Sequence, residues 1–365
     1  MRIALVISSL GPGGAERVMA LIANELVARG HDVCLITLAQ AQDDFFRLDA
    51  RVQRLRLGLS GPTTHIHQAV SANTERIRAL RRTVITLAPQ AVLSFITHTN
   101  VLMLIACLRL PVRVLVSERV DPASHRDSPI WGALRWLLYP GAAAVVVQTE
   151  RIAAWFRKRS WRPERVVIIP NPAPPCESAP DANGPPAEPF VLGAGRLVRQ
   201  KGFDLLIRAF GIVAADVPRL RLVIAGDGPE AQRLRDLVDA LGLQSRVTLA
   251  GNVRNLSALM RCADAFVLPS RYEGFPNVLL EALACGVPSV ATDCPDGPRQ
   301  ILADGKYGLL VPRDDPLALA AAIARLIGDP DLRRRLTALG PVAITPYDKQ
   351  RVIDAWESVL TAADA

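Results

Sequence analysis

Residues 270–288 read SRYEGFPNVLLEALACGVP, and this stretch decides the fold. The apolar run that ends at Pro269 predicts a short buried strand before it. Asn277 suits the N-cap of a short apolar helix, Gly286 suits the left-handed position after that helix, and Pro288 prevents its continuation. The order strand, loop, helix, strand is typical of a parallel α/β sheet.

Glu281 is a carboxylate inside this apolar helix, and a buried charge needs a partner. A salt bridge or an exposed helix face would satisfy it. Alternatively, Glu281 would accept hydrogen bonds from the vicinal diol of a nucleotide ribose. Glu273 precedes the helix, where backbone N–H groups and the helix dipole favour an anionic or hydroxyl-rich ligand. Two carboxylates around one helix start therefore predict a polyol phosphate ligand.

Length and composition indicate two globular domains. The chain has 365 residues, and half of them are apolar, which excludes disordered and fibrous proteins. Its six cysteines are scattered without a C-x-x-C pair, so we expect free thiols in a reducing cytosol. The segment Met1–Leu10 predicts a first strand rather than a signal peptide, and no run is long enough to cross a bilayer.

The positive charge belongs to the N-terminal half. Residues 1–170 contain 22 Lys and Arg against 12 Asp and Glu, whereas residues 171–365 contain 21 against 23. Interleaved aromatic residues, zinc knuckles and other nucleic-acid-binding motifs are missing from the sequence, so we expect no nucleic-acid partner. An anionic membrane surface or a phosphate-bearing acceptor suits the asymmetry better.

The N-terminal half begins with a βαβ pattern. A strand at Ile3–Ser8, a glycine-rich loop, a helix at Ala15–Arg29 and a strand at Val33–Leu38 predict a parallel sheet. The loop glycines Gly13 and Gly14 could be simple turn formers. In a parallel α/β unit, however, this loop lies at the carboxyl edge of the strands, where ligands bind.

Polar residues follow two further predicted strands of this half. His98 and Asn100 follow the strand at Ala91–Ile96, and Glu118 and Arg119 follow the strand that ends at Ser117. We expect these side chains at the same sheet edge as the glycine loop. His98 could be a histidine satisfied by its neighbours or a substrate contact.

An aromatic segment lies near the end of this half. Residues 131–139 read WGALRWLLY, an apolar run with one arginine inside. Core packing is the expected role, and a membrane-facing patch is the alternative.

A proline-rich run separates the two halves. We predict an N-terminal domain over residues 1–170, a linker over 171–189 and a C-terminal domain over 190–345. The C-terminal domain repeats the α/β order, beginning with a strand at Phe190–Ala194. The last helix, within residues 346–365, could return to the first domain.

The first loop of the second half carries two cations. Gly193 and Gly195 alone would be a weak dinucleotide fingerprint, since its third glycine is absent. Arg196 and Lys201 stand in the loop that enters the next helix. Such a pair could be a solvated loop or a clamp for a diphosphate, in which arginine supplies a planar fork and lysine a point charge.

An ordered set of motifs now carries a resemblance. The second half contains, in order, G-x-G-R-L-x-x-x-K-G from Gly193, G-x-G-P-E from Gly226, E-G-F-P-N-x-x-x-E from Glu273, A-x-G-V-P from Ala284 and D-G-x-x-G-L-L-V-P from Asp304. This set resembles the retaining glycosyltransferases of family 4. The resemblance covers nearly the whole chain, and it implies the GT-B fold, two Rossmann-like domains whose parallel sheets face each other across a cleft.

The resemblance also implies roles for individual residues. Arg196 and Lys201 would bind the diphosphate of a nucleotide-sugar, Glu281 the ribose and Glu273 the donor sugar. Arg196, Lys201 and Glu273 would be the catalytic residues. The implied donor-binding set also contains Gly14, Gly195, Gly226, Val253, Gly274, Phe275, Pro276 and Asn277. The implied acceptor-side set is Gly13, His98, Asn100, Glu118 and Arg119.

One motif departs from the family pattern. Many relatives carry a histidine after a middle strand of the N-terminal domain, and here Glu118 occupies that place within S-E-R-x-D-P. Together with C-P-D-G-P-R from Cys294, this motif looks like the branch that acts on polyprenyl-diphosphate-linked glycans, including N-acetylgalactosaminyl and amylovoran-type transferases.

The resemblance therefore implies a retaining transfer of a sugar, such as an N-acetylhexosamine, from a UDP-sugar to a lipid-linked saccharide. No metal or other cofactor is expected. The expected location is cytoplasmic, with peripheral contact on the inner face of the cytoplasmic membrane. Two alternatives stay open: a sugar-nucleotide epimerase of the same double-Rossmann plan, and a non-catalytic basic module that binds membranes or nucleic acid.

Overall fold

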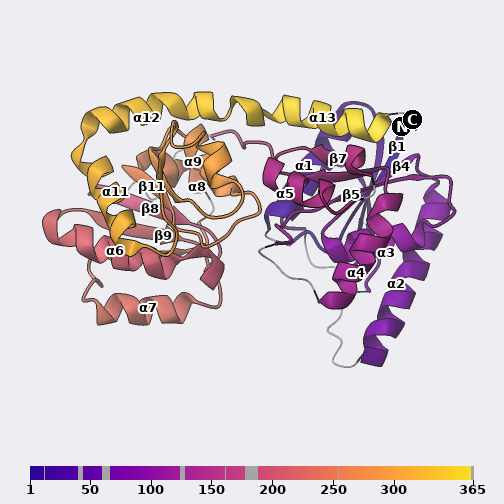
Figure 1. Cartoon of the computed structure of the whole chain (residues 1–365), viewed down its shortest axis with the longest axis horizontal. Coiled ribbons are helices and arrows are strands. Elements are labelled where there is room, and N and C mark those ends of the chain that lie inside the picture. The colour runs from indigo at the N-terminus through magenta and orange to yellow at the C-terminus, as the bar shows by residue number, and fades with distance from the viewer. Residues whose placement is uncertain are drawn as a thin grey trace. The chain divides into compact units, whose positions relative to one another are not determined.

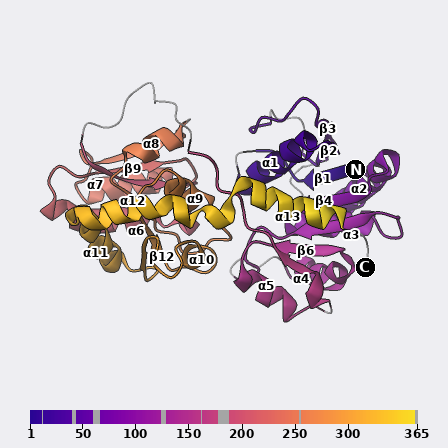
Figure 2. The same cartoon turned by 90° about the horizontal axis from the view of Figure 1, so that it is seen from above.

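The computed structural model describes residues 1–11, 13–39, 44–59, 66–123, 128–160, 162–176, 188–253 and 255–362 (Figures 1 and 2). The chain divides into two compact units. Unit 1 comprises Met1–Pro172 and Lys349–Ala365, and unit 2 comprises Ala173–Asp348. The C-terminal helix thus belongs to unit 1. Much of the predicted linker, residues 177–187, lies outside the described residues.

Unit 1 is a parallel sheet with helices on both faces (Figure 1). Its elements are β1 (Arg2–Ile7), α1 (Gly14–Ala28), β2 (Asp32–Thr37), β3 (Gln53–Arg56), α2 (Ile66–Leu87), β4 (Ala91–Phe95), α3 (Thr97–Ala106), β5 (Arg113–Ser117), α4 (Pro129–Leu138), η1 (Tyr139–Gly141), β6 (Ala144–Val147), α5 (Glu150–Arg157), η2 (Pro163–Arg165), β7 (Val166–Ile168) and α13 (Lys349–Thr361).

Unit 2 repeats this plan. Its elements are β8 (Phe190–Ala194), η3 (Arg199–Lys201), α6 (Phe203–Asp216), β9 (Arg221–Ala225), α7 (Ala231–Ala240), β10 (Val247–Gly251), α8 (Leu256–Cys262), β11 (Ala265–Leu268), α9 (Asn277–Ala284), β12 (Ser289–Thr292), α10 (Pro298–Ile301), β13 (Leu309–Val311), α11 (Pro316–Gly328), α12 (Pro330–Ala343) and η4 (Thr345–Tyr347).

Strand order places a ligand-binding edge in each unit. The sheets run β3-β2-β1-β4-β5-β6-β7 and β10-β9-β8-β11-β12-β13, and the strands of each pair in parallel. The order reverses between β1 and β4 in unit 1, and between β8 and β11 in unit 2. At such a switch point the loops after the two strands diverge and leave a crevice for ligands. The predicted α/β fold class, with two Rossmann-like domains, is confirmed.

Apolar residues from the sheet and helices form a core on each face of each sheet. In unit 1, α1 and α13 pack on one face and α2 to α5 on the other. Trp356 of α13 is fully buried, and its ring lies 5.8 Å from that of Phe95 in β4. Because α13 supplies part of this core, unit 1 is completed by the end of the chain.

Two glycines in unit 2 allow backbone segments to approach closely. Gly226 has φ 137°, and a Cβ there would lie 1.9 Å from the carbonyl oxygen of Gly195. Gly202 has φ 67°, and a Cβ there would lie 2.1 Å from the carbonyl oxygen of Pro269. Glycine is therefore required at both positions. These contacts hold the loops after β8, β9 and β11 together.

The expectation that all six cysteines are free thiols is wrong. Cys176 and Cys285 form a disulfide between the segment that opens unit 2 and the C-terminal end of α9. A separation of 109 residues hid this pair in the sequence. Four free cysteines stand elsewhere in the described residues: Cys34, Cys107, Cys262 and Cys294.

Two local expectations also need correction. Asn277 is the first residue of α9 rather than its N-cap, a position that Pro276 occupies. The aromatic segment is only partly core. Trp131 packs against the core of unit 1, whereas Trp136 and Leu137 are 52% and 59% exposed.

Candidate functional site

The site in unit 2 is built around a buried carboxylate and a lysine. Lys201 Nζ lies 2.7 and 3.0 Å from the two carboxylate oxygens of Glu273, and Ser270 Oγ donates to Glu273 Oε1 at 2.6 Å. Glu273 is only 4% exposed, and the Lys201 side chain 18%. Lys201 ends the loop after β8 and Glu273 lies in the loop after β11, so the pair stands at the switch point.

Further hydrogen bonds join these two loops. Arg271 donates from Nη1 and Nη2 to the two carboxylate oxygens of Asp204, each at 2.8 Å, and its backbone N–H donates to the carbonyl of Gln200. Burial opposes ionisation of Asp204, but the hydrogen bonds and charge of Arg271 outweigh it and lower the pKa of that carboxyl. The guanidinium thus locks the Glu273 loop onto the start of α6.

Arg196 has a different setting. Its side chain is exposed, whereas the neighbouring Leu197 is 2% exposed. The Leu197 N–H donates to the carbonyl of Asp227, and the Gly195 N–H to that of Ala225. The loop backbone is therefore fixed on the loop after β9, while the Arg196 guanidinium remains accessible to an anionic ligand.

The E-G-F-P-N motif shapes the start of α9. Phe275 is 7% exposed, and its ring lies 5.7 Å from that of Tyr347. The Glu273 N–H donates to the carbonyl of Pro295 at 3.3 Å. Glu281 lies about one turn into α9 and is 9% exposed, so it is the buried carboxylate that the sequence predicted. The motif thus places both acids around the start of one helix.

Two further predicted donor residues of unit 2 lie in these loops or against the same core. Gly274 is half-buried in the loop before α9, and Val253, also half-buried, packs against the core that contains Phe275. Cys294 is buried, and desolvation together with the charge of Glu273 raises its pKa to about 12. Its thiol is therefore kept protonated.

The polar cluster of unit 1 is buried. Glu118 is 2% exposed and accepts hydrogen bonds from Thr97 Oγ1 at 3.0 Å and from the Tyr139 hydroxyl. Asn100, fully buried, donates to the Ser117 carbonyl and the Tyr139 hydroxyl and accepts from Ser94. Desolvation, and then the charge of Glu118, raise the pKa of Tyr139 well above its usual value. The described contacts of Asn100 stabilise unit 1.

Arg119 is also buried. Its Nη2 donates to Asn171 Oδ1 at 2.5 Å, and its guanidinium lies 4.3 Å from the ring centre of Phe95. Desolvation lowers the pKa of Arg119 to about 9. The side chain joins the end of β5 to the segment where unit 1 leaves for unit 2.

His98 and the glycine loop stand at the switch point of unit 1. His98 is exposed in the first turn of α3, with its ring 4.3 Å from that of Trp131. Ile96, just before that helix, has φ 76°, a strained conformation for a β-branched residue. Gly13 is the N-cap of α1 and Gly14 its first residue. Of the predicted acceptor-side residues, His98 and Gly13 stand at this edge, next to Gly14 of the predicted donor-binding set, whereas Asn100, Glu118 and Arg119 are buried.

Sequence reasoning missed three residues that organise these sites. Ser270 and Arg271 stand inside the quoted motif stretch, but their partners Glu273 and Asp204 follow from the fold. Tyr139 was hidden in the aromatic segment. Nothing in the sequence around it signals that it donates to Glu118.

Neither a metal-binding cluster nor a membrane-spanning helix occurs among the described residues. No group of three or more His, Cys, Asp and Glu side chains there could hold a metal ion. No helix among them is both long and apolar enough to cross a membrane.

Comparison with known protein families assigns a match to each half. Residues 177–341 match the family described as glycosyl transferases group 1. Residues 13–172 match the glycosyl transferase 4-like domain. The two matches together cover both units.

Individual relatives agree with these matches. A GalNAc-α-(1→4)-GalNAc-α-(1→3)-diNAcBac-PP-undecaprenol α-1,4-N-acetyl-D-galactosaminyltransferase of Campylobacter jejuni is 27% identical over 98% of this chain and 97% of its own length. An exopolysaccharide phosphotransferase of Streptomyces coelicolor is 36% identical over 73% of this chain, which spans 28% of that relative. Anabaena HepE, solved in complex with UDP and glucose, superimposes with a TM-score of 0.80 at 20% identity over the whole of both chains.

Proposed function

We propose that this chain, which belongs to the glycosyltransferases with a group 1 domain and a 4-like domain, transfers a sugar from a UDP-sugar to a polyprenyl-diphosphate-linked saccharide. We further propose that the transfer retains the anomeric configuration, needs no metal, and moves an N-acetylhexosamine. The observation that carries the proposal is the Lys201–Glu273 pair at the switch point, with the exposed Arg196 in the same loop as Lys201.

The chemical demand of the reaction explains this pairing. When the bond between the anomeric carbon and the phosphate oxygen breaks, the sugar develops oxocarbenium character and the nucleoside diphosphate leaves with added negative charge. Preorganised cations at the leaving group are the largest available stabilisation of such a state. Arg196 and Lys201 supply two cations from one loop. The role needs no metal ion.

The carboxylates would orient the donor. Glu273 would accept hydrogen bonds from sugar hydroxyls, with the backbone of the E-G-F-P-N loop beside it, and Glu281 from the ribose diol. In the free protein Glu273 is held by Lys201 and Ser270. When a diphosphate binds, Lys201 would divide its hydrogen bonds between phosphate and carboxylate. Ser270 would keep Glu273 in place during that exchange.

Retention follows if the acceptor attacks the face from which the diphosphate departs. The acceptor oxygen forms the new bond to the anomeric carbon, and a phosphate oxygen of the leaving group takes its proton. Unit 1 would bind the acceptor, with Gly13 and His98 at its switch point. Exclusion of water from the reacting atoms would prevent hydrolysis of the donor.

Two observations support the acceptor class. The Campylobacter relative, matched over nearly the full length of both chains, carries a polyprenyl-linked acceptor in its name. The excess of Lys and Arg in residues 1–170 suits a diphosphate and an anionic bilayer. We accordingly propose a cytoplasmic location, peripheral on the inner face of the membrane.

The test measures UDP release by the purified chain with a panel of UDP-sugars and a polyprenyl-diphosphate saccharide, with and without EDTA. Release that requires the acceptor and survives EDTA is expected. Nuclear magnetic resonance of the product should show that the transferred sugar keeps the anomeric configuration that it had in the donor. A sugar that changes configuration while still on its nucleotide, without acceptor, would instead indicate an epimerase.

A pair of variants tests the diphosphate clamp. Arg196→Ala should lower kcat/KM by about a hundredfold or more. Arg199→Ala is the matched control, an exposed arginine three residues later in the same loop, and should retain parental activity. Full activity of Arg196→Ala would refute the role of Arg196.

A further inference from the structure

Helix α4 of unit 1 is apolar on two opposite sides. Its inner stripe, Trp131, Leu134 and Leu138, packs against the core. Its outer stripe consists of Ile130, Ala133 and Leu137, spaced i, i+3, i+7, with Trp136 beside it. Ile130, Trp136 and Leu137 are 70%, 52% and 59% exposed. A helix that is apolar all round is ordinarily buried in protein or in lipid.

The single cationic side chain of α4 is buried, although large apolar side chains of the same helix are exposed. Arg135 is 9% exposed, and its guanidinium lies 5.3 Å from the ring centre of Trp155 in α5. The helix therefore buries its arginine and exposes isoleucine, tryptophan and leucine. In water, a single exposed leucine is ordinary, but three large apolar side chains within eight residues form a patch that calls for a partner.

Positive charge gathers next to this outer stripe. The end of α5 and the turn after it expose Lys158, Arg159 and Arg162. Arg159 lies 4.5 Å from the ring centre of Trp155 and donates to its carbonyl. Of the acids described nearby, Glu150 is paired with Arg157, and Glu164 is exposed two residues after Arg162. Among the described residues of this segment, the three exposed cations still exceed the acids, so the local surface is positive.

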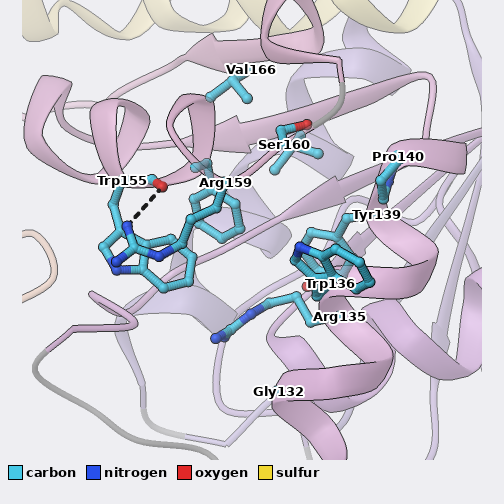
Figure 3. Close-up of a pocket in the computed structure, with 11 residues that line it drawn as sticks. Gly132, Arg135, Trp136, Tyr139, Pro140, Trp155, Arg159, Ser160 and Val166 are labelled. Atoms are coloured by element: carbon cyan, nitrogen blue, oxygen red, sulfur yellow. Dashed lines mark hydrogen bonds between the residues drawn. The ribbon is translucent and has the colours of Figure 1, made fainter.

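A pocket joins the two features. Figure 3 shows Trp155 with Arg159 on one side of it, and Trp136 with Tyr139 on the other. Arg135 also lines the pocket. Aromatic rings with basic groups at their edges are the composition that proteins present to the boundary between lipid headgroups and acyl chains.

We propose that the outer stripe of α4 and the cations Lys158, Arg159 and Arg162 form the surface by which unit 1 lies on an anionic phospholipid bilayer. The apolar side chains would enter the headgroup boundary, and the cations would contact lipid phosphates. The inference deepens the proposed function, on which it rests, because it assigns the membrane contact to one face. Because this surface is positive, its partner should be negatively charged, and we therefore propose an anionic bilayer rather than one of neutral lipids.

The first experiment measures co-sedimentation of the full chain with vesicles of about two parts phosphatidylcholine to one part phosphatidylglycerol. Binding is expected to these vesicles, to weaken at high salt, and to be poor on pure phosphatidylcholine. The affinity of the Trp136→Ser/Leu137→Ser variant for these vesicles should be lower by about tenfold or more. Its matched control is Leu317→Ser, a leucine 69% exposed in unit 2, which should bind like the parent.

The second variant tests the charge. Lys158→Glu/Arg162→Glu should lower binding to the anionic vesicles by about fivefold or more per residue and leave binding to the neutral vesicles unchanged. All substituted side chains are exposed, so circular dichroism and thermal unfolding should match the parent.

Two outcomes would overturn the proposal. One is equal vesicle binding by the Trp136→Ser/Leu137→Ser variant and the parent. The other is concentration-dependent self-association of the parent that the variant loses, with no vesicle binding by either protein, which would assign the face to a second copy.

Sugar transfer to a water-soluble acceptor separates this inference from the proposed function. Vesicle binding with no transfer to any acceptor would defeat only the function, and transfer with no vesicle binding only the surface.

Discussion

The two units have the same strand order but treat a buried carboxylate differently. In unit 1, Glu118 accepts hydrogen bonds from the hydroxyl groups of Thr97 and Tyr139. In unit 2, Glu273 is held by Lys201, with the exposed Arg196 in the same loop. Each of these hydroxyls donates a single proton to the buried Glu118, whereas the ammonium group of Lys201 has three donors and can turn one of them toward a phosphate. The same topology thus places a buried carboxylate in both units, and only in unit 2 does the described partner suit the proposed binding of an anion.

The largest effect is expected from the lysine that makes this difference. Lys201→Met should lower kcat/KM by about a thousandfold, because the leaving diphosphate loses a preorganised cation. It should also destabilise unit 2, since Glu273 loses its charged partner. Steady-state kinetics and urea unfolding measure the two effects. Lys306→Met, at an exposed lysine of the same unit, should change neither. Parental kinetics of the Lys201 variant would remove the contrast between the units.

The disulfide gives the next effect, again confined to unit 2. Loss of the Cys176–Cys285 bond in Cys176→Ser should lower the free energy of unfolding by about 3 kcal/mol, because the unfolded chain regains the freedom that the bond removes. Denaturant unfolding without reductant measures it, and Cys262→Ser, at an exposed free cysteine, is the control. Titration of six free thiols in the unreduced, denatured parent would contradict the bond.

A smaller effect is expected in the buried polar cluster of unit 1. Tyr139→Phe removes a donor from the buried carboxylate of Glu118 and should cost about 2 kcal/mol of stability. Urea unfolding of this variant can be compared with Tyr307→Phe at a half-buried tyrosine of unit 2. Unchanged stability would show that water or another group satisfies Glu118 equally well.

The smallest effect concerns the clamp between Arg271 and Asp204. The pKa of the Asp204 carboxyl is lowered in the folded protein. The ion pair therefore stabilises the fold above the unfolded pKa of about 4, and this stabilisation is lost as the pH falls through the lower folded pKa. Asp204→Asn should cost about 1 kcal/mol at neutral pH and less below pH ~4. Stability measured against pH for variant and parent checks this. An equal difference at every pH would exclude the ion pair as its source.

Much of the fold could be predicted because hydrophobic periodicity, and the glycines and prolines that end helices and strands, are local features of the sequence. Apolar runs that end at Pro269 or before Gly11 mark strands, and Gly286 indeed has the left-handed φ of 69° that ends α9. The motif order supplied the residues of the proposed donor site. Capping was less certain, because Asn277 and Pro276 are both compatible with a helix start and the choice depends on how the loop packs.

The sequence by itself determined two α/β units and the order along the chain of the loops that carry the motifs. It also identified the acids and cations of the proposed donor site: Arg196, Lys201, Glu273 and Glu281. Only the tertiary structure decided which of these groups meet. It paired Lys201 with Glu273, closed Glu118 with Tyr139, joined Cys176 to Cys285 and turned Trp136 outward. The physical reason is that local patterns fix backbone conformation, whereas these contacts join residues far apart in the chain or depend on which helix face finds a partner.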